Sequence, residues 1–304
     1  MIHRLPRLLW AALVATLLAT VTACAGADSS IAMSGSPGVD HGTTTHDGPA
    51  RIVSISTVAT EMLFAIGAGD RVVAVDSMSN FPAEAPMTDL SGFEPNVEAI
   101  LGFEPDLVIL SYDPGDVVAS LDAAGVESLL QGAAYTIDDT YAQIETLGAV
   151  TGDVEAADAL VADMQAEMAA LADSVEPRDE PLSYYHELDD TLYTVTSSTF
   201  IGAVYALAGL VNAADPTDAD GSAWGYPQVS AEYLLDADPD LVLLADTKCC
   251  DQDATTVAAR PGWENLTAVS EGRIIELDDD VASRWGPRIV DFLRSIVEAV
   301  NAID

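Results

Sequence analysis

Residues 96–110 read Asn-Val-Glu-Ala-Ile-Leu-Gly-Phe-Glu-Pro-Asp-Leu-Val-Ile-Leu, and residues 230–244 read Ser-Ala-Glu-Tyr-Leu-Leu-Asp-Ala-Asp-Pro-Asp-Leu-Val-Leu-Leu. In both stretches a glutamate, Glu98 or Glu232, stands seven positions before a Pro-Asp pair. An apolar helical turn separates the glutamate from the Pro-Asp pair, and four apolar residues follow the pair. Because a proline ends a helix and a short apolar run is typical of a buried strand, each stretch predicts one helix-to-strand step. The repetition of this step predicts two lobes of similar design.

The length and charge of the chain restrict the functions that it can have. At 304 residues it can hold two domains of ordinary size. Its formal net charge is −39, from 50 acidic and 11 basic residues, and Lys248 is the only lysine. This balance argues against binding of nucleic acid and against electrostatic docking on anionic lipid, since both need basic surfaces. The acidity predicts either a high-salt surrounding, where ions screen the repulsion between carboxylates, or a genome composition that favours Asp over Lys.

The N-terminus has the pattern of an export signal. Arg4 and Arg7 precede an apolar run, residues 8–21, that is too short to span a membrane comfortably. Residues 21–24, Val-Thr-Ala-Cys, then resemble the lipobox of bacterial lipoprotein signal peptides, which implies cleavage before Cys24 and lipidation of its sulfur. A plain secretory peptide that is cut at a small residue is the alternative. We expect an extracytoplasmic protein that lipidated Cys24 anchors to the cell membrane.

The rest of the chain is predicted to form a tether, two lobes and a connecting helix. Apolar runs alternate with helical patterns in both lobes, which predicts two Rossmann-like α/β lobes with parallel central sheets. The second lobe is expected to begin with Leu182–Glu187, followed by a hairpin through residues 189–190 into Leu192–Val195. Residues 153–174 contain no Gly or Pro, which predicts a single long helix between the lobes, or else an ordinary surface helix of one lobe. The predicted boundaries are 1–23 for the signal peptide, 24–50 for the flexible tether, 51–152 for the N-terminal lobe, 153–175 for the connecting helix and 176–304 for the C-terminal lobe.

Several motifs, taken in their order, give the chain a resemblance to a known family. They are Arg51–Gly69, Phe81–Ala85, Gly92–Leu110, Tyr226–Glu232 and Arg284–Ile289. The chain resembles the periplasmic-binding proteins of ABC importers for vitamin B12 and ferric siderophores, whose two lobes are joined by one long helix. The resemblance extends from Arg51 to the C-terminus. It implies a monomer without enzymatic activity or a cofactor of its own, which captures a metal chelate (cobalamin, another corrinoid or a ferric siderophore) and delivers it to an ABC permease dimer.

The same resemblance assigns a docking role to Glu98 and Glu232. The family places one such glutamate on each lobe, where it pairs with arginines of the permease. Two carboxylates at a fixed separation suit this task, because charge-assisted pairs give orientation as well as affinity. The alternative is that each is an ordinary exposed glutamate in the first turn of a helix, where the helix dipole favours it.

The ligand is expected in a cleft between the lobes, lined by loops at the carboxyl ends of strands. Aromatic faces would bury a large planar or apolar chelate there, although packing in a core is the alternative role for each aromatic residue. Phe93 and Tyr226 stand where the vitamin B12 binders of the family carry tryptophan, which keeps an aromatic wall and leaves the identity of the ligand open. The candidates are Thr57, Phe81, Phe93 and Tyr112 from the first lobe, and Tyr185, His186, Trp224, Tyr226, Arg284 and Trp285 from the second.

Polar residues near the expected cleft allow more than one role each. Arg284 could bind a carboxylate, phosphate or hydroxamate oxygen of the ligand, or neutralise the acidic run at residues 278–280. His186 could coordinate cobalt, iron or haem, or form a structural hydrogen bond. Cys249 and Cys250 are an even pair outside the cytoplasm and are predicted to form a vicinal disulfide, with free thiols or intermolecular bridges as the alternatives.

Other classes of function find less support in the residues. His-based catalysis has little material, because His41 and His46 stand in the expected tether. No Gly-rich phosphate loop or zinc-ligand cluster appears in the sequence, and the component of a zinc or manganese importer would need several cleft histidines or carboxylates. A haem-binding protein of an ABC importer, and an anchored interaction module without a small ligand, stay open as alternatives.

Overall fold

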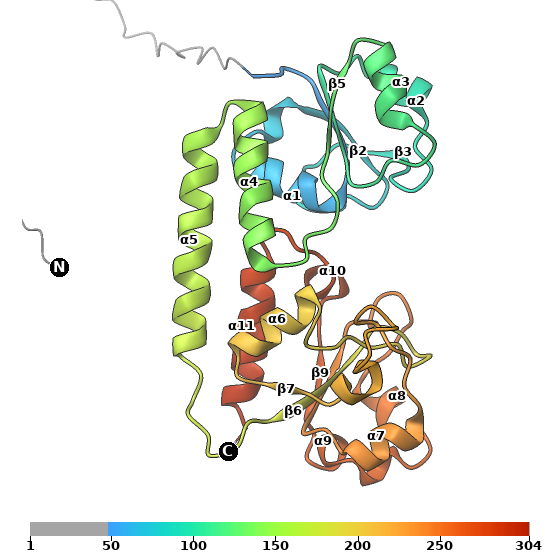
Figure 1. Ribbon diagram of the computed structural model, residues 1–304, viewed down its shortest axis with the longest axis vertical. Helices are drawn as coiled ribbons and strands as arrows, with labels where there is room; N and C mark the ends of the chain where they lie inside the picture. The colour runs from blue at the N-terminus through green and yellow to red at the C-terminus, as the bar shows by residue number, and fades with distance from the viewer. Residues whose placement is uncertain (1–47, 304) are drawn as a thin grey trace, which may run out of the picture. The chain divides into compact units, whose positions relative to one another are not determined.

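Two parallel β-sheets organise residues 48–303, the part of the chain that the computed structural model describes (Figure 1). The first sheet has the strand order β3-β2-β1-β4-β5, and the second has the order β7-β6-β8-β9. Every neighbouring pair of these strands is parallel. The predicted signal peptide and the lipidation site at Cys24 lie outside the described residues.

Strands and helices alternate along the chain, as the sequence predicts. The strands are β1 (Ile52–Ile55), β2 (Val72–Asp76), β3 (Met87–Leu90), β4 (Leu107–Leu110), β5 (Glu127–Leu130), β6 (Ser183–Glu187), β7 (Val211–Asn212), β8 (Leu241–Leu244) and β9 (Ile274–Glu276). The helices are α1 (Thr57–Ala65), α2 (Val97–Leu101), α3 (Val117–Ala123), α4 (Ile137–Thr151), α5 (Val154–Asp173), α6 (Phe200–Leu207), α7 (Ala231–Ala237), α8 (Ala254–Ala258), α9 (Thr267–Ser270), α10 (Asp279–Ala282) and α11 (Ile289–Asn301). The predicted fold class of two α/β lobes is confirmed.

The two repeated stretches fold into the same unit, a short helix followed by an interior strand. The first stretch forms α2 and β4, and the second forms α7 and β8. Both strands are buried at every position, because each lies between two neighbours in its sheet and is covered on both faces. The residue before each proline, Glu104 or Asp238, takes the left-handed backbone conformation, with φ of 49° and 43°. The duplication therefore extends to the backbone geometry.

The aspartate of each Pro-Asp pair fixes the beginning of a neighbouring strand. The Asp106 carboxylate accepts hydrogen bonds of 3.0 Å and 2.9 Å from the backbone N–H groups of Ala50 and Arg51, just before β1. In the second lobe the Asp240 carboxylate accepts from the backbone N–H and the hydroxyl of Ser183, both at 2.8 Å, at the start of β6. These bonds satisfy backbone donors that the ladder does not reach, and they tie β1 to β4 and β6 to β8.

The chain passes from the first sheet to the second through α4 and α5. A capping box begins α4, in which the side chains of Thr136 and Asp139 each accept from the other's backbone N–H. α4 and α5 lie side by side, and α5 also packs against α11 (Figure 1). One buried apolar cluster includes residues of all three helices and of α1 and α6. The two lobes are thus joined by a shared core as well as by the chain.

The structure differs from the sequence-based prediction at several short elements. The predicted hairpin strand at residues 192–195 is absent, and only an isolated bridge links Tyr193 to Gln228. The Asp189 carboxylate accepts from the backbone N–H and hydroxyl of Thr191, at 2.9 Å and 2.6 Å, and so closes a turn in place of a regular strand. The edge strands β3 and β7 were not predicted. Within residues 48–303, none of the helices combines the length and the apolar character needed to cross a membrane.

Candidate ligand-binding site

The carboxyl ends of strands from both sheets meet at one place, here called the lobe junction. Loop residues after β2 contact the segment after β9: the Asn80 Nδ2 donates to the Asp280 carboxylate at 3.1 Å, and the Arg284 guanidinium donates to the Met78 carbonyl at 3.3 Å. In parallel sheets, ligands gather at the carboxyl ends of the strands. The lobe junction is therefore the first place to look for a site.

A buried carboxylate of the first lobe binds two arginines of the second. The Glu61 side chain, on α1, is 1% exposed. It accepts from Arg284 at 2.9 Å and from Arg288 at 2.6 Å and 2.9 Å. The hydrogen bonds that Arg288 donates to the Glu61 carboxylate raise the pKa of Arg288. Here the term junction bridge means Glu61, Arg284 and Arg288, and it holds the two lobes together.

Further acidic residues surround the junction bridge. Arg284 also donates to the Asp280 carboxylate at 2.7 Å, and the Lys248 ammonium donates to Asp278 at 2.7 Å and to Asp280 at 3.0 Å. Burial works against ionisation of Asp280, but the hydrogen bonds from Lys248 and Asn80 outweigh it and lower the pKa of that carboxyl. The cations at the junction are thus already paired with carboxylates of the protein.

A pocket of about 300 Å³ is lined by segments of both lobes. The first lobe contributes the loop that leads into α4, and the second contributes the segment that leads into α6. Tyr135, in the first segment, is 81% exposed. Tyr226, 45% exposed, follows Gly225, whose carbonyl accepts from the Thr196 N–H at 2.9 Å. Burial, and then the nearby Tyr135, raises the pKa of Tyr226. The pocket is lined by Tyr135, Thr136, Ile137, Asp138, Ser197, Ser198, Thr199 and Ala203.

Most of the aromatic residues predicted from the sequence are exposed and free to meet a ligand. They are Phe81 at 43%, Phe93 at 74%, Tyr112 at 57%, Trp224 at 88% and Tyr226 at 45% exposed. The Phe81 ring lies 4.2 Å from the Arg288 guanidinium, and it therefore borders the junction bridge. Thr57 is the first residue of α1, two residues after the carboxyl end of β1.

The other predicted ligand residues are engaged inside the protein. Tyr185 and His186 are 0% exposed on β6, so neither reaches the surface. The His186 Nδ1 lies 2.7 Å from the Tyr205 hydroxyl, and burial lowers the pKa of His186 to about 3, which keeps the ring neutral. The Trp285 Nε1 donates to the Gln143 amide oxygen at 3.1 Å. A ligand contact by Tyr185 or His186 has no support in the structure, because other side chains enclose them.

For Arg284 and for the two cysteines the structure matches the second alternative that the sequence left open, which is neutralisation of the acidic run for Arg284 and free thiols for the cysteines. Arg284 is 9% exposed and bound to Glu61 and Asp280, so it serves the lobe junction and is not available to a ligand. Cys249 and Cys250 are free thiols, and the predicted vicinal disulfide is not formed. Within residues 48–303 no group of three or more His, Cys, Asp and Glu side chains is arranged to hold a metal ion.

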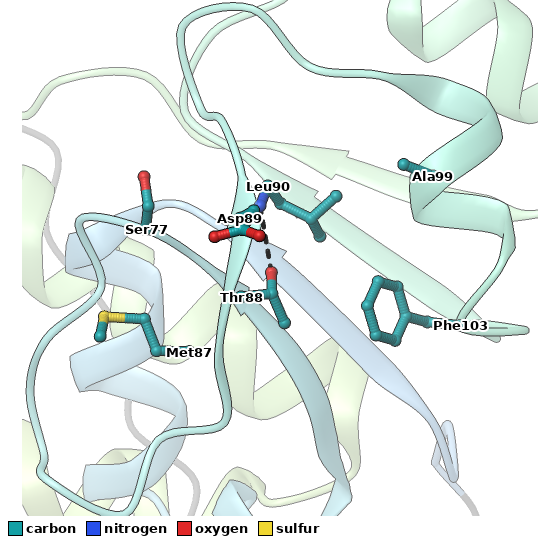
Figure 2. A pocket seen from close by; sticks show the side chains of 7 residues that line it. All are labelled: Ser77, Met87, Thr88, Asp89, Leu90, Ala99 and Phe103. Carbon is teal, nitrogen blue, oxygen red and sulfur yellow. Dashed lines mark hydrogen bonds between the residues drawn. The ribbon is translucent and has the colours of Figure 1, made fainter.

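A larger pocket, of about 580 Å³, is lined by residues of the first lobe alone (Figure 2). Figure 2 shows Thr88 and Asp89 at its centre, with Phe103 and Ala99 on one side of them and Met87 and Ser77 on the other. The Thr88 hydroxyl accepts from the Leu90 N–H at 3.2 Å and so keeps the end of β3 in place. None of the predicted ligand residues lines this pocket.

The predicted docking glutamates occupy equivalent positions in the two lobes. Glu98 is the second residue of α2 after its cap Asn96, and Glu232 is the second residue of α7 after its cap Ser230. Both glutamates are exposed. α2 and α7 belong to different lobes and lie on the side of the sheets away from α5 (Figure 1).

The sequence interpretation missed the two features that define the lobe junction. Glu61 and Arg288 carried no local signal, because their meeting depends on segments that are 227 residues apart. Tyr135 could have been found, since it lies after the carboxyl end of β5, and the same rule selected Tyr112 after β4.

Comparison with known proteins gives the family. The model of the periplasmic binding protein family matches residues 52–281, and the chain belongs to this family. A cobalamin-binding protein of Halobacterium salinarum is 33% identical over 263 residues, which cover 83% of this chain and 70% of that protein. An uncharacterized ABC transporter substrate-binding lipoprotein of Bacillus subtilis, YvrC, is 28% identical over 261 residues, which cover 83% of this chain and 80% of that protein.

A solved structure is similar over nearly its whole length. The periplasmic heme-binding protein RhuT of Roseiflexus sp. RS-1, in its apo form, superposes with a TM-score of 0.71 at 27% identity and covers 84% of this chain and 99% of that one. These likenesses confirm the family predicted from the sequence. The protein is a substrate-binding component of ABC import that acts outside the cytoplasm, and it is not an enzyme.

Proposed function

We propose that this protein captures a metal chelate, a corrinoid or a ferric siderophore, at the lobe junction and delivers it to an ABC permease. The observation that carries the proposal is the junction itself, where strand ends of both sheets meet beside a pocket lined by both lobes. Exposed aromatic side chains, Phe81 and Tyr226 among them, offer flat apolar faces for a large chelate. The cobalamin-binding relative supports the choice of ligand class.

The mature protein is proposed to be held at the cell membrane by a lipid on Cys24. The lipobox-like residues 21–24 and the lipoprotein name of the Bacillus subtilis relative support this anchor. An acylated cysteine keeps a protein at a membrane without any spanning helix. Residues 24–50, rich in Gly, Ser, Thr and Asp and without a helical period, would then separate the anchor from the lobes.

Delivery is proposed to go through Glu98 and Glu232, with the protein docking as a monomer on a permease dimer. Their equal positions in α2 and α7 and their exposure support this role, because two carboxylates on rigidly joined lobes can engage two basic clusters at once. The junction bridge and the shared apolar core restrict movement of one lobe against the other. The spacing of the two glutamates is therefore expected to be nearly the same with and without ligand.

Haem is the second candidate ligand, because the structural neighbour RhuT is named as a heme-binding protein. Haem offers the planar apolar surface that the exposed aromatic residues suit. The buried His186, however, cannot coordinate its iron in this structure.

Binding of a coloured chelate tests the proposed function. The purified protein is titrated with cyanocobalamin and with a ferric hydroxamate, and complexes are counted by native mass spectrometry. We expect a one-to-one complex that is weakened at least ~10-fold by Trp224→Ala or Tyr226→Ala, because each removes an exposed aromatic face. Met87→Ala, in the pocket on the first lobe, is the matched control and should bind as the unchanged protein does. If no metal chelate binds, the proposed function is wrong.

A further inference from the structure

Basic side chains are scarce in this protein, and each one that the structure describes already has partners. The chain has 11 basic residues, of which Arg4 and Arg7 lie outside the described part. The remaining cations determine whether the lobe junction can bind a negatively charged ligand. They are Arg51, Arg71, Arg178, Lys248, Arg260, Arg273, Arg284, Arg288 and Arg294.

Five of these cations lie away from the lobe junction. Arg51, Arg71 and Arg273 directly precede β1, β2 and β9, so they stand at the amino ends of strands, opposite to the edge where the sheets meet. Arg178 donates to backbone carbonyls at the end of α11 and just after it, and Arg294 pairs with Asp291 and with Glu167 of α5. None of these five is placed to meet a ligand at the junction.

The other four cations follow carboxyl ends of strands, and each is paired with a carboxylate. Lys248 pairs with Asp278 at 2.7 Å, and Arg260 pairs with Glu187 at 2.5 Å and 2.6 Å. Arg284 and Arg288 share Glu61, as described above. The carboxylates that bind the three arginines are buried: the side chain of Glu187 is 0% exposed and that of Glu61 is 1% exposed.

Because these acids are buried, the arginines cannot easily leave them to bind a ligand. If an arginine turned toward a ligand, a carboxylate would be left buried without a partner, which is strongly unfavourable. The arginines therefore stay with Glu61 and Glu187. Lys248 is the most accessible of the four, with its side chain 51% exposed, but two carboxylates already surround its ammonium.

Negatively charged and neutral polar side chains line the pocket at the junction, and no basic side chain is among its lining residues. Asp138 lines it directly. The Asp215 carboxylate lies behind it and accepts from the Ser197 N–H at 2.8 Å and from its hydroxyl at 2.7 Å. Ser198 supplies a further hydroxyl, which lies 2.7 Å from that of Thr196. These groups accept hydrogen bonds from N–H and O–H donors and repel anions.

We infer that the lobe junction selects chelates whose outer edge is uncharged or positively charged and carries amide or hydroxyl donors, and that it rejects chelates with carboxylate or catecholate anions. This inference rests on the proposed function and narrows its ligand class. Corrinoids with amide side chains and cationic ferric hydroxamates meet the condition. Haem, with two propionates, and ferric tris-catecholates do not.

Four probes that differ in charge test the selection. Cyanocobalamin has an amide-bearing edge and no net charge, ferrioxamine B is a cation, haemin carries two carboxylates, and ferric enterobactin carries three negative charges. Dissociation constants are measured at low and at molar salt by quenching of intrinsic fluorescence. At low salt we expect at least one of the first two probes to bind ~100-fold more tightly than either anion, because unscreened like charges in a binding site cost several kcal/mol.

The outcomes separate the inference from the proposed function. An anionic chelate that binds as tightly as the neutral or cationic ones overturns the inference and leaves the proposed function standing. If none of the four probes binds, the proposed function fails and the inference fails with it. Salt that strengthens binding of the anions but not of cyanocobalamin supports the electrostatic origin of the selection.

Two variants test the mechanism directly. Ser198→Arg adds a guanidinium to the pocket, and Asp138→Asn removes a carboxylate with little change in shape. Each should shift the ratio of the haemin affinity to the cyanocobalamin affinity at least ~10-fold in favour of haemin. Ser120→Arg, on the exposed surface of α3, is the matched control and should change neither. If Asp138→Asn folds, by circular dichroism, and the ratio of the two affinities does not shift, the charge argument is refuted.

Discussion

Removal of the Glu61 carboxylate is expected to destabilise the protein by roughly 3 kcal/mol. Breaking a buried ion pair from one side costs about 3–5 kcal/mol, because the remaining charge is left without a partner. Glu61 receives three hydrogen bonds from two guanidinium groups and is 1% exposed, so it meets this condition. Arg284 retains Asp280 after Glu61→Ala, which places the expected loss at the lower limit of that range.

Thermal and urea unfolding measure this loss. For a folded unit of about 150–250 residues, each kcal/mol corresponds to roughly 2–4 °C, so Tm should fall by roughly 6–12 °C in Glu61→Ala. Glu167→Ala is the matched control. It removes an exposed carboxylate, 53% accessible, from Arg294, and exposed pairs contribute about 0–1 kcal/mol.

A double-mutant cycle separates the ion pair from other effects of the substitution. Glu61→Gln and Arg288→Met are each expected to destabilise, and the double variant should lose less than the sum of the two, since the second change removes the charge that the first one exposed. A loss in Glu61→Ala no larger than that in Glu167→Ala, or full additivity in the cycle, would refute the assignment of Glu61 as the carboxylate that joins the lobes.

Three further predictions follow from other parts of the molecule. Glu98→Arg combined with Glu232→Arg should abolish uptake of the chelate by cells and leave its affinity for the purified protein unchanged. The control is Glu264→Arg, which changes an exposed glutamate outside α2 and α7 and should leave uptake intact. Normal uptake by the double variant would exclude the docking role. Burial, and then the charge of Glu187, raises the pKa of Asp246 to about 7 from 3.8. The folded protein therefore keeps a proton that the unfolded chain has released, and this contribution to stability is lost as pH rises from about 4 to 7, so Asp246→Asn should unfold with a flatter pH profile across that window. Tm should rise between about 0.1 M and 2 M salt if screening relieves repulsion among the 50 acidic residues, and a constant Tm would favour genome composition as the origin of the acidity.

The repeated helix-to-strand step could be predicted because its signals are local. A capped helical turn, a Pro-Asp pair and an apolar run identify α2 with β4 and α7 with β8 without any knowledge of the rest of the chain. The edge strand β3, Met-Thr-Asp-Leu, could not be found in this way, since three of its residues are not buried and it has no apolar run. The function of the aspartate in the repeat was also hidden, because Asp106 and Asp240 bind strand starts that lie more than 50 residues away.

The sequence predicts where a candidate site should lie, at the carboxyl ends of strands, but it does not predict which residues contact one another there. Exposed aromatic residues near strand ends, such as Tyr112 and Phe81, follow from the rule for parallel sheets. Arg284 was judged from its neighbours in sequence, which left ligand binding and neutralisation of residues 278–280 as alternatives. The structure favours the second, and it adds Glu61, which no local pattern could have placed beside Arg284.

The placement of the basic residues explains why a strongly acidic protein can still have a rigid junction. An exposed carboxylate needs no partner, because water and ions solvate it, whereas a buried one needs a cation or a proton. In this chain Glu61 and Glu187 take arginines, and Asp246 is expected to hold a proton. Three of the few cations, Arg260, Arg284 and Arg288, are therefore located where acids are buried, after the carboxyl ends of strands, and their pairing leaves that region without free positive charge. The same arrangement that joins the lobes thus decides which ligands can enter between them.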